Sequence, residues 1–306
     1  MNVLVTGAGG FVGSQVARAL LAAGHQVRAP AREESPREAV EDVAGRIEWV
    51  AADVFAGDVT SLASLARGIE LCVHCAWYAV PGQYLASAEN LRCVTGSLRL
   101  LEALAGAGCR RAVFVGSCFE YAFGPEPLTE TSAVRPQSLY AASKLATRFM
   151  GEQLAALRGL EFVWARLFYL YGPFEDRRRL VPAVIDSLLR GERADVTRGT
   201  QVRDFLHVAD VGAALVAIAL GDLTGVVNVG SARPVSVGEV VGTIETLLGR
   251  EGLVRYGARA ENPTDPPFVC ADNRRLVEGT GWAPAHDLAS GLRQTIEWSK
   301  SRLVPR

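Results

Sequence analysis

The chain alternates short runs of apolar and β-branched residues with longer segments in which apolar residues recur at helical spacing. From this pattern we predict strands at 2–6, 25–29, 46–53, 70–76, 111–117 and 161–168, and helices at 11–23, 84–106 and 138–157. Strands that alternate with helices form parallel sheets, because each helix carries the chain back to the starting edge. The pattern therefore predicts an α/β fold with a doubly wound parallel sheet, covered by helices on both faces.

A glycine-rich turn joins the first predicted strand directly to the first predicted helix. The segment 6–13 reads TGAGGFVG. Gly7 and Gly10 let the chain turn and let a pyrophosphate approach the backbone, and Gly13 permits close helix–strand packing. The helix N-terminus, with Phe11 and Val12, supplies amide donors and partial positive charge. We predict that this turn binds a nicotinamide dinucleotide.

The regular alternation loosens after Tyr169, where turn-forming and polar residues become frequent, and long apolar segments return at 205–230. This indicates a smaller lobe interleaved with the first. We expect a dinucleotide-binding domain at 1–168, to which 205–230 returns, and a smaller C-terminal substrate-binding lobe at 169–204 and 231–306.

The choice of cofactor depends on the end of the second strand. A carboxylate there would bind the ribose hydroxyl of NAD, whereas an arginine would suit the 2′-phosphate of NADP. This strand runs into Arg32, with Arg28 inside it and Glu33 and Glu34 just beyond. Because guanidinium groups bind phosphate well, we expect NADP(H) in preference to NAD(H). The other expected cofactor contacts follow the third and fourth strands: Asp53, at the adenine edge, Val54 and Ala76.

Tyr140 and Lys144 form the expected catalytic pair. They are four residues apart in a predicted helix and therefore on one face of it. A free tyrosine has a pKa of about 10, and an adjacent ammonium lowers it toward the range of proton transfer. Ser117 ends a strand at the carboxyl edge of the sheet, where its hydroxyl can bond the reacting oxygen. We expect all three residues to be catalytic, with Lys144 and Tyr140 also contacting the cofactor.

Composition excludes several classes of protein. The 32 basic and 33 acidic residues leave a formal charge of −1, without the basic excess needed for binding nucleic acid. The N-terminus has no secretory pattern, and no apolar run reaches membrane-spanning length, so we expect a cytoplasmic protein with no membrane contact. The six cysteines are expected to be reduced, and Cys72 and Cys75 to be core residues of a strand, with no metal site.

The motifs together resemble the extended short-chain dehydrogenase/reductase family, and within it the nucleotide-sugar epimerase, dehydratase and ketoreductase group. The resemblance covers nearly the whole chain and implies a Rossmann fold with a smaller C-terminal lobe. It depends on TGAGGFVG at 6–13, Asp53, Ser117 with Tyr121, Tyr140 with Lys144, RLFYLYGP at 166–173 and QVRDFLHVAD at 201–210.

The resemblance also implies a substrate and its contacts. A nucleoside-diphosphate sugar would lie between the lobes, with Arg203 on its diphosphate. Its sugar ring would lie against the nicotinamide. The other expected substrate contacts are Trp77, Tyr78, Glu120 and Tyr169. Members of the group commonly form homodimers through the helices predicted at 84–106 and 138–157.

Two departures from the family pattern affect the substrate lobe. The family commonly has asparagine at the position of Tyr169 and arginine at the position of Asn262. Diphosphate contacts are therefore expected to be rearranged, with Arg259 or the arginine cluster near Arg178 as candidates.

The residues after Ser117 help to select among the activities of the group. Dehydratases of the group carry acidic residues one or two positions later, where this chain has Cys118 and Phe119, so dehydration is disfavoured. The missing acid near Arg32 favours reduction of a 4-keto-sugar nucleotide by NADPH, with Tyr140 as proton donor. The alternative activity is NAD-dependent 4-epimerisation. A non-catalytic protein that senses NAD(P) is the alternative of another class.

Overall fold

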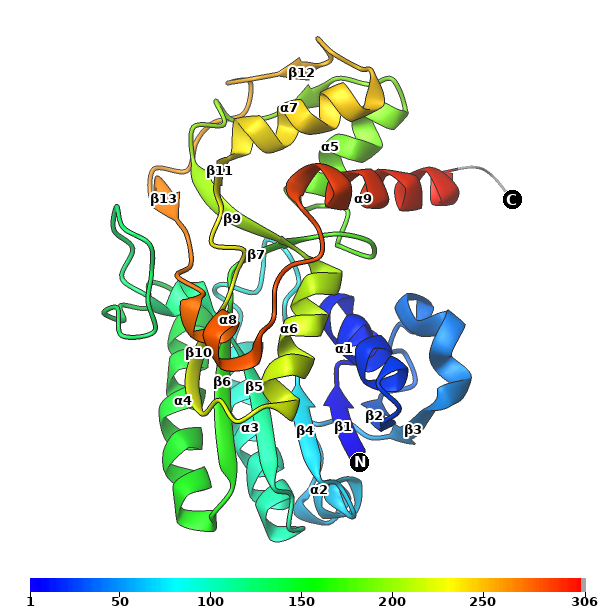
Figure 1. Ribbon diagram of the computed structural model, residues 1–306, viewed down its shortest axis with the longest axis vertical. Helices are drawn as coiled ribbons and strands as arrows, with labels where there is room; N and C mark the ends of the chain where they lie inside the picture. Colours follow the sequence, from blue (N-terminus) through cyan, green and yellow to red (C-terminus); the bar gives the residue numbers. More distant parts are fainter. Residues whose placement is uncertain (304–306) are drawn as a thin grey trace.

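The structure, a computed structural model, describes residues 1–303 and is built around a sheet of seven parallel strands (Figure 1). All six strand pairs in this sheet are parallel. In spatial order the strands are β10 (Gly225–Val229), β6 (Glu161–Leu167), β5 (Arg111–Ser117), β4 (Leu71–His74), β1 (Asn2–Thr6), β2 (Gln26–Ala31) and β3 (Ile47–Ala51). The predicted doubly wound sheet is therefore confirmed, and with it the Rossmann architecture.

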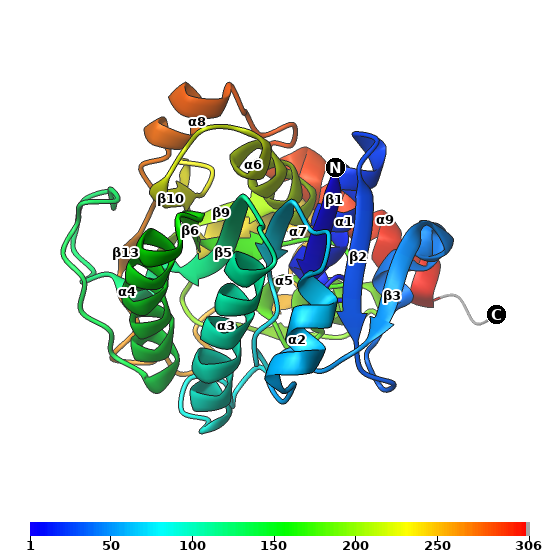
Figure 2. The same cartoon turned by 90° about the horizontal axis from the view of Figure 1, so that it is seen from below.

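Helices cover both faces of this sheet, as Figure 2 shows from below. One face carries α1 (Phe11–Ala22), the 3-10 segment η1 (Glu38–Arg46), α6 (Val208–Leu220) and α8 (Arg274–Thr280). The other carries α2 (Val59–Ala66), α3 (Glu89–Gly106) and α4 (Leu139–Arg158).

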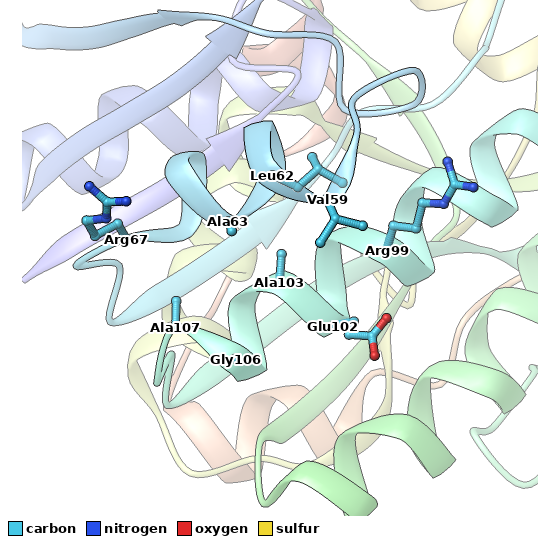
Figure 3. Close-up of a pocket in the computed structure, with 9 residues that line it drawn as sticks. All are labelled: Val59, Leu62, Ala63, Arg67, Arg99, Glu102, Ala103, Gly106 and Ala107. Carbon is cyan, nitrogen blue, oxygen red and sulfur yellow. The ribbon is translucent and has the colours of Figure 1, made fainter.

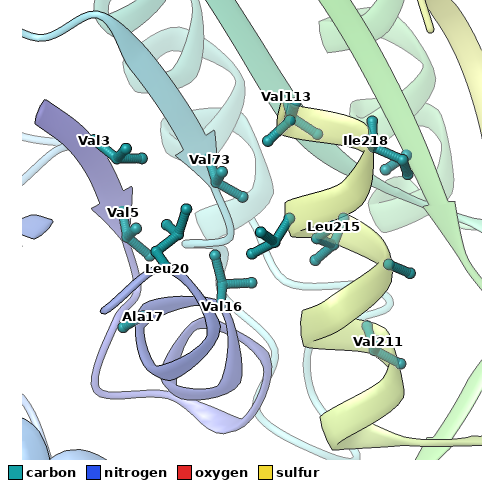
Figure 4. Packing of buried hydrophobic residues seen from close by; sticks show 14 of the residues in the cluster. Val3, Val5, Val16, Ala17, Leu20, Val73, Val113, Val211, Leu215 and Ile218 are labelled. Carbon is teal, nitrogen blue, oxygen red and sulfur yellow. The ribbon is translucent and has the colours of Figure 1, made fainter. Parts of the chain in front are cut away.

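The apolar core explains this layering. Side chains of a strand point alternately to the two faces of a sheet, so Val3 and Val5 of β1 pack with α1 and α6 (Figure 4). Leu4, between them, packs with the helices of the opposite face. Both faces of the sheet are buried, which explains why its strands read as continuous apolar runs.

A smaller lobe lies above the carboxyl edge of the seven-stranded sheet (Figure 1). It contains a four-stranded sheet of β7 (Tyr169–Tyr171), β9 (Val202–His207), β11 (Pro234–Ser236) and β13 (Phe268–Val269). A two-stranded sheet pairs β8 (Ala194–Asp195) with β12 (Val254–Arg255), and the helices are α5 (Leu180–Leu189), α7 (Val237–Leu248) and α9 (Leu288–Leu303). These helices share an apolar cluster of their own.

Some predicted elements differ from the observed ones. The helix expected at 84–106 begins only at Glu89, because Asn90 bonds the carbonyls of Tyr84 and Ser87 and holds the preceding residues in a turn. The return of the chain to the large domain, expected from residue 205, begins with α6, whereas β9 belongs to the small sheet. Among the described residues, no helix has the length and apolar character needed to cross a membrane.

Candidate active site

The glycine turn has the close contacts expected of a dinucleotide site. Gly7 has a φ of 68°, a conformation that side chains disfavour. A Cβ at Gly7 would lie 3.0 Å from the amide nitrogen of Ala76, and one at Gly13 would lie 2.1 Å from the Gly7 oxygen. No side chain caps the N-terminus of α1 at Gly10. The turn therefore presents bare backbone to a ligand and fits a diphosphate.

A buried chain of hydrogen bonds fixes the end of β4 against this turn. The Thr6 hydroxyl lies 2.7 Å from Nδ1 of His74 and accepts from the amide of Ala76 at 3.1 Å. Nε2 of His74 lies 2.8 Å from the Ser97 hydroxyl in α3. Burial lowers the pKa of His74 to about 3, so the ring is neutral at physiological pH. Sequence reasoning missed His74, because its hydroxyl partners lie 68 and 23 residues away.

The expected adenosine side of the site contains Asp53, Val54 and Arg32. Oδ1 of Asp53 accepts from the amides of Phe55 and Ala56, which fixes the loop that follows β3. Val54 is buried in the core. Arg32 follows β2 on the surface, and its Nε lies 3.2 Å from the Glu34 carboxylate.

Two observations weaken the expectation of NADP. A 2′-phosphate at Arg32 would have to displace the carboxylate of Glu34. Arg28 does not support Arg32, because its guanidinium donates to the carbonyls of Leu65 and Arg67 and pairs with Glu48 at 3.0 Å. The part of the earlier expectation that involved Arg28 is therefore wrong.

Tyr140 and Lys144 lie in the first turns of α4, with Ser117 at the end of β5. Ser138 caps this helix by accepting from the amide of Ala141 at 3.1 Å. Lys144 is buried, and its Nζ donates to the carbonyl of Val115 at 2.7 Å. The same Nζ lies 5.9 Å from the centre of the Tyr140 ring. The helix thus brings the phenol and the ammonium to the carboxyl edge of the sheet.

The electrostatics of this pair differ from the expectation. Burial raises the pKa of Tyr140 above its usual value, while hydrogen bonding with Ser117 acts in the opposite direction. Burial also lowers the pKa of Lys144 to about 7, although the charge of Glu120 opposes this shift. The charge on Lys144 at neutral pH is therefore sensitive to its immediate contacts.

Glu120 is not available to a substrate, contrary to our expectation. It is fully buried, and its Oε1 accepts from the amide of Ser117 at 2.8 Å. Its Oε2 pairs with Nε of Arg166 at 2.7 Å, and Trp164 Nε1 donates to Oε1 at 2.9 Å. A Cβ at Gly116 would lie 2.2 Å from that indole nitrogen, so only glycine fits there. Glu120 therefore supports the backbone of Ser117 from beneath.

Two aromatic residues contact the catalytic pair, and a third, Tyr78, lies in the same loop. The Trp77 ring centre lies 3.8 Å from Nζ of Lys144. Tyr84 meets the Tyr140 ring edge to face, with the ring centres 4.9 Å apart. The Tyr78 hydroxyl donates to Oε1 of Gln83 at 2.8 Å. Of the expected substrate contacts, Trp77 lies against the catalytic lysine itself.

Tyr169 and Arg203 lie together in the small lobe. The guanidinium of Arg203 is 5.2 Å from the centre of the Tyr169 ring, and its NH1 donates to the carbonyl of Val202 at 2.8 Å. Its NH2 lies 2.7 Å from the Asp265 carboxylate. Arg203 is buried, whereas Asp265 is about one third exposed. A diphosphate at Arg203 would have to compete with this exposed partner.

The arginines proposed as additional diphosphate contacts are in different surroundings. Arg259 is exposed, and Arg178 pairs with Asp176 at 2.7 Å on the surface. Arg179 instead lies over the Tyr84 ring, with its guanidinium 5.2 Å from the ring centre. Of these arginines, Arg179 is the one placed against an aromatic residue that contacts the catalytic pair.

Two other features lie outside this site. A surface pocket between α2 and α3 contains none of the expected site residues (Figure 3). His207, Asp210 and His286 bring their potential ligand atoms within 4.8 Å of one another. Both oxygens of Asp210 accept from backbone amides, those of Ala285 and His286, so this cluster ties the segment before α9 to α6.

Comparison with known proteins gives a consistent result. Residues 3–230 match the NAD dependent epimerase/dehydratase family. The chain is 32% identical to a UDP-glucose 4-epimerase of Azospirillum brasilense, over 98% of this chain and 92% of that protein. It is 30% identical to a dTDP-4-dehydro-6-deoxy-D-allose reductase of a Streptomyces species, over 97% of this chain and 95% of the relative.

The same similarity holds in three dimensions. The structure of MoeE5 in complex with UDP-glucuronic acid and NAD superposes with a TM-score of 0.87 at 31% identity, covering 99% of this chain and 100% of that one. The glycine turn, the Tyr140 and Lys144 pair and the match over most of the chain agree, and this protein belongs to the NAD-dependent epimerase/dehydratase family of extended short-chain dehydrogenases.

Proposed function

We propose that this protein is an NAD-dependent 4-epimerase of a nucleoside-diphosphate sugar. The observation that carries the proposal is the group of Ser117, Tyr140 and Lys144 at the sheet edge beside the glycine turn. Relatives of at least 30% identity include UDP-glucose 4-epimerases of Azospirillum brasilense and Streptomyces lividans. These relatives favour epimerisation over the ketoreduction that the sequence alone suggested.

The chemistry assigned to the chain is movement of one proton at one sugar oxygen. NAD, when bound, would supply a nicotinamide that accepts a hydride from the sugar carbon and returns it to the opposite face of that carbon. Tyr140 takes the hydroxyl proton during oxidation and gives it back during reduction. The Ser117 hydroxyl holds the oxygen, and Lys144 stabilises the phenolate by its charge.

The remaining contacts concern binding. Arg203 would hold the diphosphate after exchanging its Asp265 partner, and the walls formed by Trp77, Tyr78 and Tyr169 would enclose the sugar. We favour NAD over NADP, because MoeE5 is known with NAD and because Glu34 already pairs with Arg32. The cytoplasmic location expected from the sequence stays a prediction.

Reduction of a 4-keto-sugar nucleotide by NADPH is the second candidate. It is favoured by the β2 end, where Ala31 is followed by Arg32 and no carboxylate lies at the strand end itself. The similarity to the reductase of a Streptomyces species supports it as well.

One assay separates the two candidates. We expect purified protein to retain NAD and to convert UDP-glucose or UDP-glucuronic acid to its 4-epimer without added cofactor, as followed by chromatography of the nucleotide sugars. Oxidation of NADPH that depends on a 4-keto-sugar nucleotide, with no epimer formed, would establish the reductase instead. Binding of cofactor with no turnover of either substrate class would indicate a sensor.

We also propose a homodimer through α3 and α4. These two helices pack against each other and expose apolar side chains, Leu91 on α3 and Phe149, Met150 and Leu157 on α4. Two copies facing each other would bury these residues in a four-helix bundle.

Phe149→Asp should convert the dimer to a monomer, because a charge would replace an apolar side chain in the buried interface. Light scattering coupled to gel filtration measures the mass. Val277→Asp on α8, which removes a comparably exposed apolar residue elsewhere, should leave the dimer intact. A monomeric wild-type protein at micromolar concentration would contradict this proposal.

A further inference from the structure

Aromatic rings contact both catalytic side chains. Trp77 places its ring centre 3.8 Å from Nζ of Lys144. The rings of Tyr84 and Tyr140 meet edge to face, with their centres 4.9 Å apart. The two aromatic residues come from the loop between β4 and α3, which has no regular secondary structure.

A single buried amide fixes this loop. Oδ1 of Asn90 accepts from Nε1 of Trp77 at 2.8 Å. Its Nδ2 donates to the carbonyls of Tyr84 at 2.6 Å and Ser87 at 2.9 Å. The indole can only donate and the carbonyls can only accept, so these partners determine the orientation of the amide. Asn90 is fully buried, and both of its amide hydrogens are used.

The contact with Trp77 compensates for the desolvation of Lys144. Its Nζ donates a hydrogen bond to the carbonyl of Val115 at 2.7 Å. It is only 3% exposed, so solvent contributes little. An indole face attracts a cation through its quadrupole and takes the place of part of the lost hydration.

We propose that Trp77, braced by Asn90, is a positioning residue that keeps Lys144 charged and aligned beside Tyr140. The proposal rests on the proposed function for its meaning in catalysis, but the contact itself can be measured without turnover. Removing the indole face should shift the Lys144 equilibrium toward the neutral amine, and the phenolate of Tyr140 would then lose its counter-charge.

The groups around Lys144 allow its titration to be assigned. Glu120 pairs with the buried Arg166, and burial lowers the pKa of His74 to about 3. Burial raises the pKa of Cys75 to about 12, and it also raises those of Cys93 and Tyr140. Burial lowers the pKa of Lys144 to about 7. A titration between pH 6 and 9 at this location therefore reports Lys144.

The composition of the chain makes a direct measurement possible. Lys144 and Lys300 are its two lysines, and Lys300 lies on the surface of α9 beside Glu297. Protein labelled with carbon-13 at the lysine ε-carbons should thus give two side-chain signals. The Lys300 signal serves as an internal reference in every variant.

The decisive variants are Trp77→Leu and Trp77→Phe. In Trp77→Leu we expect the Lys144 titration to move down by about 0.5 to 1.5 pH units, the range expected for a desolvated cation–π contact. Trp77→Phe keeps an aromatic face and should shift it by less than half as much. In the NAD-loaded enzyme, the alkaline limb of the pH profile of kcat should move in the same direction.

Trp49→Leu is the matched control, because it removes an indole that lies 4.5 Å from the guanidinium of Arg37, away from the catalytic pair. It should leave the Lys144 signal unchanged. An unchanged or raised Lys144 titration in folded Trp77→Leu would overturn the proposal. If that variant does not fold, Trp77→Phe and Asn90→Ala decide, since loss of the brace should also lower the titration. If the wild-type protein showed no epimerase activity, the proposed function would be rejected, but the effect of Trp77 on the Lys144 titration would still stand.

Discussion

Tyr140→Phe is expected to lower kcat for epimerisation by about a thousandfold, the range typical of a lost general acid–base group. Phenylalanine keeps the ring that packs on Tyr84 and Trp77 and removes only the hydroxyl. The contacts made by other residues to the nucleotide and the sugar stay in place, so KM and the bound NAD content should change much less than kcat. The loss therefore belongs to proton transfer and not to binding.

The measurement is a steady-state assay of the 4-epimer together with the absorbance spectrum of the purified protein. Tyr256→Phe is the control: its hydroxyl bonds Glu245 in the small lobe at 3.0 Å, so it removes a hydrogen-bonded phenol outside the site. That variant should retain wild-type kcat. If Tyr140→Phe retained more than a tenth of the activity, another group would have to move the proton.

The parts of the site that the sequence could predict are set by local geometry. Gly7 and Gly13 are recognisable because a turn between a strand and a helix has few solutions. Tyr140 and Lys144 are recognisable because a spacing of four residues places two side chains on one helix face. In each case the information lies within a few residues of the chain.

The parts that could not be predicted depend on partners distant in the sequence. Asn90 lies in the first turn of α3, and nothing in its local sequence indicates that it bonds Trp77, 13 residues earlier. The loop at 84–88 has helix-forming residues, but bonds from Asn90 to its carbonyls override that preference. The sequence also does not reveal that Arg32, on which the expectation of NADP rested, pairs with Glu34.

Glu120 is the clearest example of this limit. The sequence places it three residues after Ser117, and we expected it among the substrate contacts. Its partners Trp164 and Arg166 lie on β6, 44 and 46 residues away. The register between β5 and β6 pairs Gly116 with Arg166. This register brings Trp164 and Arg166 next to Glu120 at the end of β5.

The two roles of Glu120 predict different results for Glu120→Ala. A sugar contact would affect KM and leave stability unchanged. If Glu120 is instead the buried partner of Arg166, the variant should lose about 3 to 5 kcal/mol in the free energy of unfolding, because an unpaired guanidinium stays in the core. The amide of Ser117 and the indole of Trp164 would also lose their acceptor. We expect the second result, measured by denaturant unfolding followed by circular dichroism.

Glu152→Ala provides the matched control, because its partly exposed pair with Arg148 at 2.8 Å should be worth less than about 1 kcal/mol. Replacing both members of the buried pair, as Glu120→Leu with Arg166→Met, should recover part of the stability, since no charge then remains unpaired. The double variant should still have reduced kcat, because the Ser117 backbone keeps no acceptor beneath it. A Glu120→Ala protein that is as stable as the wild type and has a raised KM would instead indicate that this carboxylate contacts the substrate.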